Sequence, residues 1–127
     1  MSARIGTIGW LDITVEDADG LRDFYQSVVG WKTEAIEMGD YADYAMGGEG
    51  GPVAGVCHRK GTNADVPKGW LPYIVVESLD KSLDACQSGG GRIRSDPKKM
   101  GDIGRYAMIE DPAGGVIALW EDLKKEE

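Results

Sequence analysis

Two stretches of the 127-residue chain decide the fold: GWLDITV at residues 9–15 and GWLPYIVV at residues 69–76. The first stretch alternates apolar and polar residues and is rich in β-branched side chains, which predicts a β-strand. The second is more continuously apolar, which predicts a strand buried on both faces. Their shared opening, sixty residues apart, indicates that the chain repeats itself.

A helix is predicted after each of these strands. Asp17 is expected to cap the first helix, and Gly30 is expected to end it. Ser78 is expected to cap the second helix, which the glycines at 89–91 end. The apolar stripes that should face the core are Leu21, Phe24, Tyr25 and Val28 in the first helix, and Leu79, Leu83 and Cys86 in the second.

The repeat continues beyond the helices at the same offset. Tyr44-Ala45-Met46 matches Tyr106-Ala107-Met108, and each triplet is followed by a turn and a final apolar strand, at residues 53–57 and 116–120. This order predicts an α+β fold of two tandem βαβββ modules that form a cupped mixed sheet with helices on the outside. We expect a single domain over residues 1–127, with modules at about 5–58 and 69–122 and a linker at 59–68.

Composition excludes several classes of function. The formal net charge of −8 argues against sequence-independent binding to nucleic acid, which requires a basic surface. No segment has the length and apolarity of a membrane span or a signal peptide, so we expect a cytoplasmic protein. Cys57 and Cys86 are then expected to be reduced thiols.

Several motifs in this order resemble the vicinal oxygen chelate superfamily, which includes glyoxalase I, extradiol dioxygenases and bleomycin- and fosfomycin-resistance proteins. The resemblance spans residues 8 to 121 and is closest to glyoxalase-like members of mostly unassigned role. It implies the cupped fold, a small-molecule ligand and a homodimer. The motifs that carry it are Val15-Glu16-Asp17, Phe24-Tyr25, Gly30-Trp31, Gly101-Asp102-Ile103-Gly104-Arg105, Glu110-Asp111-Pro112-Ala113-Gly114-Gly115-Val116-Ile117 and Leu119-Trp120.

The resemblance also shows where metal-binding members hold their ion, on the first and last strands of each module. The corresponding positions here are Trp10, Gly55, Leu71 and Ala118, with Trp70 as an alternative to Leu71. None of these side chains is a ligand for a divalent cation. We therefore expect no metal and no other cofactor, and a metal-dependent glyoxalase or dioxygenase is disfavoured. His58, the only histidine, is expected at the surface or rim, on the other strand face from Cys57.

Strand alternation predicts an aromatic and apolar lining for the cup, with a few polar points. Asp12 is the polar residue of most interest, because a carboxylate on an apolar face must be paired or bind something. Trp31 is instead expected to be structural. If the side chains of the two Tyr-Ala-Met triplets pointed the opposite way, Ala45 and Ala107 would line the cup in place of the Tyr and Met side chains. The candidate ligand-binding residues are Trp10, Asp12, Thr14, Met46, Cys57, Tyr73, Tyr106, Met108 and Trp120.

Three functions remain open from the sequence. The first is a metal-independent binding protein of the resistance type for an aromatic or cationic small molecule. The second is a metal-independent lyase or isomerase in which Asp12 or a tyrosine transfers a proton. The third is a structural or regulatory domain whose cup is filled by its own side chains.

Overall fold

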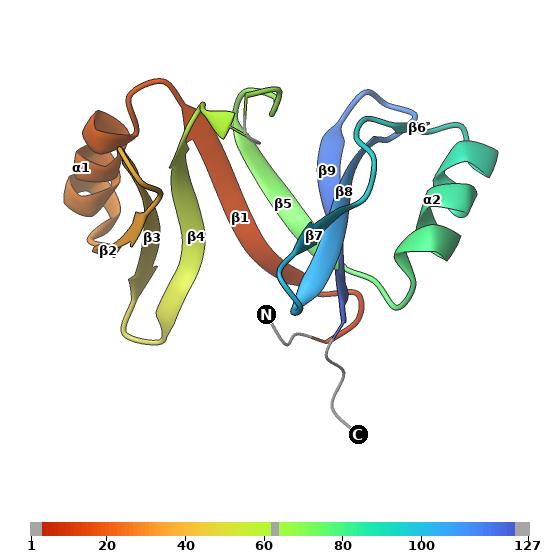
Figure 1. Cartoon of the computed structure of the whole chain (residues 1–127), viewed down its shortest axis with the longest axis horizontal. Coiled ribbons are helices and arrows are strands. Elements are labelled where there is room, and N and C mark those ends of the chain that lie inside the picture. Colours follow the sequence, from red (N-terminus) through yellow and green to blue (C-terminus); the bar gives the residue numbers. More distant parts are fainter. Residues whose placement is uncertain (1–3, 62–63, 124–127) are drawn as a thin grey trace. The chain divides into compact units, whose positions relative to one another are not determined.

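A computed structural model describes residues 4–61 and 64–123 (Figure 1). Residues 1–3, 62–63 and 124–127 lie outside the described residues, and with them part of the expected linker at 59–68. The chain divides into two compact units. The N-terminal unit spans Trp10–Trp70. The C-terminal unit comprises, among the described residues, 4–9 and 71–123.

The N-terminal unit consists of one helix and four paired strands. β1 and β4 pair in parallel, and the β2–β3 and β3–β4 pairs are antiparallel, which gives the strand order β2-β3-β4-β1. The elements are β1 (Ile8–Val15), α1 (Ala18–Val29), β2 (Lys32–Glu37), β3 (Ala42–Gly48) and β4 (Gly51–His58).

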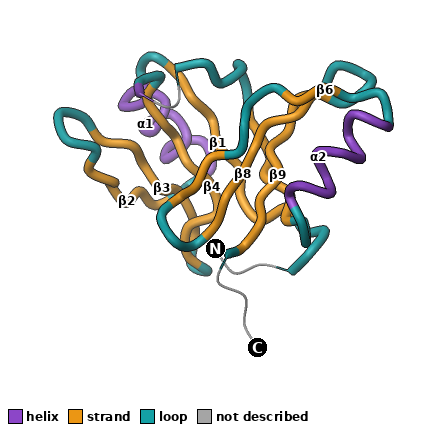
Figure 2. Tube along the Cα trace, turned by 45° about the vertical axis from the view of Figure 1, so that its right-hand side comes forward, coloured by secondary structure: helices purple, strands orange, loops and turns teal. Residues whose placement is uncertain are grey.

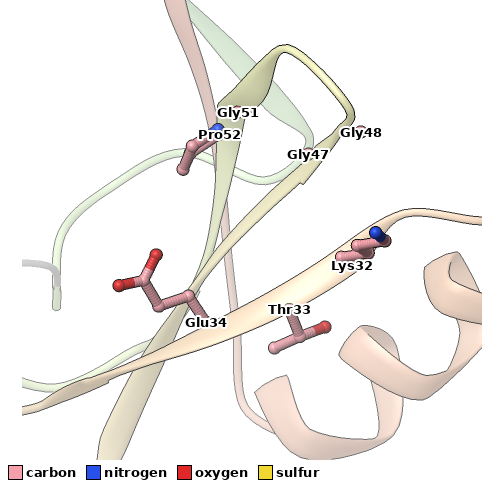
Figure 3. A pocket seen from close by; sticks show the side chains of 7 residues that line it. All are labelled: Lys32, Thr33, Glu34, Gly47, Gly48, Gly51 and Pro52. Atoms are coloured by element: carbon pink, nitrogen blue, oxygen red, sulfur yellow. The ribbon is translucent and has the colours of Figure 1, made fainter.

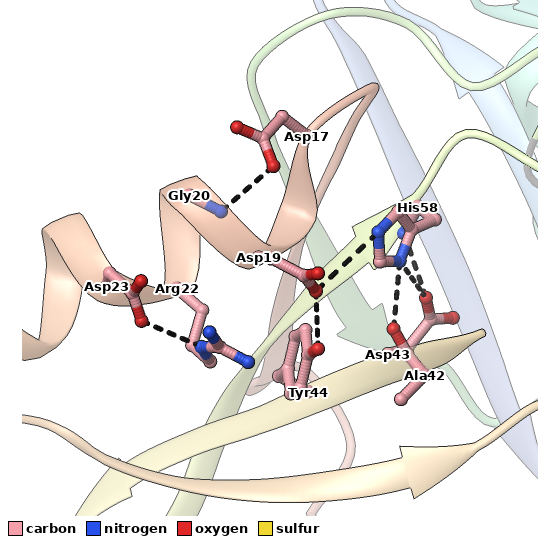
Figure 4. Close-up of polar contacts among 9 residues, drawn as sticks. All are labelled: Asp17, Asp19, Gly20, Arg22, Asp23, Ala42, Asp43, Tyr44 and His58. Carbon is pink, nitrogen blue, oxygen red and sulfur yellow. Dashed lines mark hydrogen bonds and ion pairs between the residues drawn. The ribbon is translucent and has the colours of Figure 1, made fainter.

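Local interactions set the ends of α1 where the sequence predicts them. The Asp17 carboxylate accepts a hydrogen bond from the backbone N–H of Gly20 at 3.0 Å (Figure 4). Gly30 ends the helix in the left-handed conformation, at φ 82°. The predicted stripe is correct only in part, because Leu21 and Tyr25 pack against the core while Phe24 and Val28 are 53% and 63% exposed.

The side of the strands that faces α1 forms the core of the N-terminal unit. Its buried members are Ile13, Ala18, Tyr44, Met46 and Val56. Aromatic rings extend this core. Trp70 donates a hydrogen bond from its indole nitrogen to the Tyr25 hydroxyl at 3.1 Å, and Trp31 lies edge-on to Trp70. The structural role expected for Trp31 is confirmed.

The C-terminal unit has the strand order β5-β9-β8-β6, with β7 also paired to β8. Ser78 caps its helix as predicted, and the predicted turn after β8 closes with a hydrogen bond from Gly114 N–H to Asp111 O at 3.0 Å. The elements are β5 (Trp70–Val75), α2 (Leu79–Ser88), β6 (Arg92–Ile93), β7 (Lys98–Met100), β8 (Gly104–Glu110) and β9 (Val116–Asp122).

The predicted α+β class is confirmed, with each helix lying against strands of its own unit (Figure 2). In the C-terminal unit α2 packs onto Ala107 and Leu119, with Ile74 beside them. Within residues 4–61 and 64–123, neither helix has the length and apolar character required to cross a bilayer.

The two Tyr-Ala-Met triplets are not structurally equivalent. In β3, Tyr44 and Met46 face α1 and belong to the core, whereas in β8 it is Ala107 that faces the helix. Met46 is 0% exposed and packs with Ile13 and Val56, so it does not share a strand face with Asp12. The prediction of Met46 as a ligand-binding residue is therefore wrong, and the alternative parity, with Ala45 on that face, holds in β3.

Candidate functional site

The candidate site of the N-terminal unit lies on its helix-free face, defined as the side of β1, β3 and β4 that points away from α1. Strand alternation places Trp10, Asp12 and Thr14 of β1 there, because Ile13 and Val15 pack on the side of α1. In β4 the same face carries Gly55 and Cys57, which lie opposite Asp12 and Thr14 in the parallel β1–β4 pair. Four predicted site residues are thus brought together on one surface.

A hydrogen-bonded tryptophan–aspartate pair lies on this face. The indole nitrogen of Trp10 donates a hydrogen bond to Asp12 Oδ1 at 2.5 Å. Gly55 lies beneath the pair, and a β-carbon placed on it would meet Asp12 Oδ1 at 2.3 Å. The carboxylate therefore occupies the space that a side chain at position 55 would require.

A buried carboxylate and a thiol lie on the same face. Asp43 is opposite the β4 position of Cys57 in the antiparallel register that pairs Tyr44 with Val56, and its side chain is 8% exposed. Burial raises the pKa of the Cys57 thiol, and the carboxylates of Asp12 and Asp43 raise that pKa further. The thiol therefore stays protonated near neutral pH and is a poor nucleophile.

The C-terminal unit carries a second group of predicted residues, on the side of β8 and β9 that points away from α2. The rings of Tyr106 and Trp120 stack with centroids 6.3 Å apart, and Tyr73 lies 5.9 Å from Tyr106. Trp120 donates its indole N–H to Asp122 at 2.6 Å and is 2% exposed. Met108 is buried on the same side, opposite Ala118.

His58 lies in a polar cluster between α1, β3 and β4 that shares Asp43 with the helix-free face (Figure 4). Its Nδ1 lies 2.8 Å from the carbonyl oxygen of Ala42, which can only accept, so Nδ1 donates. Asp43 accepts from the His58 backbone N–H at 2.8 Å, and Asp19 lies 3.8 Å from Nε2. The sequence predicts a surface or rim position for His58. The side chain is only 12% exposed because α1 and β3 cover the ring, so a surface position is wrong and a rim position is not contradicted.

A small surface pocket lies elsewhere in the N-terminal unit, between β2 and the β3–β4 hairpin (Figure 3). Its volume is about 190 Å³, less than the roughly 300 Å³ at which sites for drug-sized ligands begin. None of the predicted site residues lines it. The lining residues are Lys32, Thr33, Glu34, Gly47, Gly48, Gly51 and Pro52.

A family model described as "Glyoxalase/Bleomycin resistance protein/Dioxygenase superfamily" matches residues 7–119, almost the whole chain. The chain belongs to this superfamily. The resemblance found from the sequence motifs, to the vicinal oxygen chelate group, is confirmed.

Curated relatives within the superfamily are longer proteins. "Putative glyoxylase CFP32" of Mycobacterium tuberculosis is 31% identical over 123 residues, which is 93% of this chain and 46% of that protein. "Anthracycline biosynthesis protein DnrV" of Streptomyces peucetius is 26% identical over 91% of this chain and 46% of its own length. The chain thus spans about half the length of the curated relatives it matches.

Solved structures share the fold at low sequence identity. Methylmalonyl-CoA epimerase from Mycobacterium tuberculosis has a TM-score of 0.60 at 20% identity, covering 96% of this chain and 93% of that one. A superfamily member from Vibrio splendidus has a TM-score of 0.63 at 12% identity, covering 89% and 97%. At these identities the similarity shows the fold alone.

The family resemblance assigns the metal ligands of the superfamily to four positions of this chain, and the side chains at these positions do not fit a metal. In the N-terminal unit they carry Trp10 and Gly55, and in the C-terminal unit Leu71 and Ala118, none of which is a metal ligand. Nor do residues 4–61 and 64–123 contain another group of three or more His, Cys, Asp or Glu side chains arranged to hold a metal ion.

Sequence reasoning missed two contributors to the helix-free face. Asp43 precedes the Tyr-Ala-Met triplet and alternates with Ala45, so correct parity would have placed it beside Cys57. The steric role of Gly55 was also missed. The sequence signal for this role is a glycine that lies opposite a carboxylate in the neighbouring strand. It can be recognised only when the register of the two strands is known.

Proposed function

We propose that this superfamily member binds a small aromatic or cationic molecule without a protein-bound metal, with Trp10 and Asp12 as its anchoring pair. The observation that carries the proposal is the hydrogen bond from the Trp10 indole to Asp12. It fixes a carboxylate beside the ring of an aromatic residue, and these two groups together attract an organic cation.

The ligand class follows from the chemistry of both units. The partly exposed Tyr73 and Tyr106 give the C-terminal unit an aromatic surface of its own. The net charge of −8 favours the approach of cations. One relative is named for anthracycline biosynthesis, and anthracyclines are polycyclic aromatic compounds. The side chains at the four positions that the resemblance assigns to metal ligands are not metal donors, which supports metal-independent binding.

A ligand screen tests this function directly. Aromatic cations and neutral aromatic compounds of the same shape are added separately, and tryptophan fluorescence and the melting temperature are recorded. We expect at least one cation to shift both signals, with and without prior EDTA treatment. The absence of a shift with every compound would contradict the proposal, as would binding that is lost with EDTA and restored by a divalent metal.

Acid–base catalysis is the second candidate function. It is favoured by the buried Asp43 carboxylate and the protonated Cys57 thiol beside Asp12, since carboxylates are among the side chains that transfer protons in enzymes. Under this alternative, Asp12→Asn abolishes turnover of a substrate found in the screen while ligand binding and the circular dichroism spectrum persist. Unchanged turnover in that variant would exclude Asp12 as the acid or base.

We propose that the protein is a homodimer and that it is located in the cytoplasm. The curated relatives are about twice as long as this chain, so a second copy would supply a matching length of chain. Light scattering after gel filtration should give twice the chain mass of 13.7 kDa. A monomer at micromolar concentration would contradict this assembly.

A further inference from the structure

Gly55 is a glycine that the backbone does not require. It lies within β4 and is absent from the glycines with positive φ, so any residue could adopt its conformation. Glycine inside a strand also costs roughly 0.5–1 kcal/mol relative to alanine. The reason for glycine at this position must therefore lie in the space above it.

That space is filled by the tryptophan–aspartate pair. A β-carbon at position 55 would lie 2.3 Å from Asp12 Oδ1 and 3.3 Å from Trp10 Nε1. Asp12 and Gly55 lie opposite each other in the β1–β4 register. The Asp12 carboxylate could therefore avoid the added β-carbon only by rotating away from it. The rotation would break the 2.5 Å hydrogen bond with the indole.

The C-terminal unit contains the same arrangement once more. Trp120 donates to Asp122 two residues later, and Gly104 lies opposite Asp122 in the β8–β9 pair. A β-carbon on Gly104 would meet Trp120 Cζ2 at 2.2 Å. Trp120 is buried, however, whereas Trp10 retains partial exposure. Of the two arrangements, the one at Trp10 is therefore the one a ligand can reach.

We propose that Gly55 is a specificity-determining residue, which positions the Asp12 carboxylate for a ligand carrying an organic cation; this inference rests on the proposed binding function. A carboxylate that accepts a hydrogen bond from a neutral indole keeps its negative charge, so it can still attract an organic cation. The Trp10–Asp12 hydrogen bond uses the N–H at the edge of the indole, so this bond does not itself occupy the π face, which is the part of the ring that attracts a cation.

The test compares Gly55→Ala with the wild type by calorimetric titration of N-methylquinolinium, a cation, and quinoline, its neutral counterpart at pH 7.5. Gly48→Ala is the matched control, because a β-carbon on this β3 glycine meets no atom within 4 Å and its φ is not positive. We expect Gly55→Ala to lower the affinity for N-methylquinolinium about tenfold, the size of one close ion pair, and to leave quinoline binding unchanged. Gly48→Ala should bind both compounds as the wild type does.

Each other outcome contradicts a specific part of the inference. Equal loss of both compounds in Gly55→Ala would show a structural role only, and unchanged binding of the cation would remove any role for Gly55. If the wild type binds neither compound with measurable heat and the broader screen is also negative, the proposed function itself fails. If Gly55→Ala does not fold, the double variant Gly55→Ala/Asp12→Ala should recover folding, and a failure to recover would overturn the steric argument.

Discussion

The Trp10 indole N–H lies 2.5 Å from the Asp12 carboxylate, two residues further along β1 on the same strand face. A hydrogen bond to a charged acceptor is stronger than one between neutral groups. It explains how a carboxylate is tolerated on a largely apolar sheet face. The pair places an aromatic ring and a negative charge side by side on the helix-free face of the N-terminal unit.

Trp10→Phe should weaken both folding and cation binding. The substitution keeps most of the apolar ring but removes the N–H donor, which leaves the half-buried Asp12 carboxylate without that partner. We expect a loss of about 1–2 kcal/mol in the free energy of unfolding, measured in urea. Trp31→Phe is the control, since Trp31 packs on the α1 side of the unit. A fully stable Trp10→Phe variant would show that the hydrogen bond contributes nothing to folding.

Gly104→Ala should destabilise the C-terminal unit. The new β-carbon would lie 2.2 Å from the ring of Trp120, which is buried. Overpacking of this kind costs about 1–3 kcal/mol. Thermal unfolding compared with Gly48→Ala measures the effect. Equal melting temperatures for the two variants would mean that Trp120 can shift at no cost.

Cys57 should resist alkylation in the folded protein. Burial raises the pKa of its thiol, and Asp12 and Asp43 raise that pKa further, so less thiolate is present at a given pH than in a free cysteine. Iodoacetamide modification followed by peptide mass spectrometry should show slow reaction in buffer and fast reaction in urea. Asp43→Asn should accelerate the reaction of the folded form. Rapid modification of Cys57 in the native wild type would contradict the burial of this thiol.

The Asp19–Tyr44 contact should affect how the free energy of unfolding depends on pH in acid. Tyr44 donates a hydrogen bond to the Asp19 carboxylate, which lowers the pKa of Asp19 and raises that of Tyr44. Because the folded pKa of Asp19 is depressed, this stabilisation is present above about pH 4, the ordinary value for Asp, and is lost as the pH falls through the folded value.

Tyr44→Phe removes the donor and so should raise the midpoint of Asp19 towards its ordinary value. An NMR titration of the side-chain carboxyl carbon follows that midpoint directly. Between about pH 5 and about pH 2, the range in which carboxyl groups titrate, the free energy of unfolding should fall less in the variant than in the wild type. An Asp19 midpoint identical in both proteins would contradict the contact.

The sequence was sufficient to predict the strands with strong apolar patterns and the helix ends with capping residues. It did not place β2, β6 or β7. β2 is mostly exposed and reads as polar, and its strand conformation depends on pairing with β3 rather than on its own side chains. β6 and β7 have only two and three residues and depend in the same way on β8.

The candidate site was predictable only where strand parity was unambiguous. Trp10, Asp12 and Thr14 follow from the alternation of β1, whose apolar partners are β-branched. Met46 was misplaced because the repeated triplet was assumed to face the same way in both modules, whereas the register puts Ala45 opposite Gly55 and Met108 opposite Ala118. Packing against α1 decided this parity, and no local pattern reports it.

The most direct test of metal-independent cation binding at Trp10 and Asp12 is a ¹H–¹⁵N NMR titration with N-methylquinolinium in the presence of EDTA. The chain has only four tryptophans, and Trp10→Phe assigns the Trp10 indole signal. That signal should move saturably in the wild type, while the Trp31 and Trp70 signals stay in place, and the cation should cause no such movement in Asp12→Asn. An unmoved Trp10 signal, or an identical response in Asp12→Asn, would contradict the account.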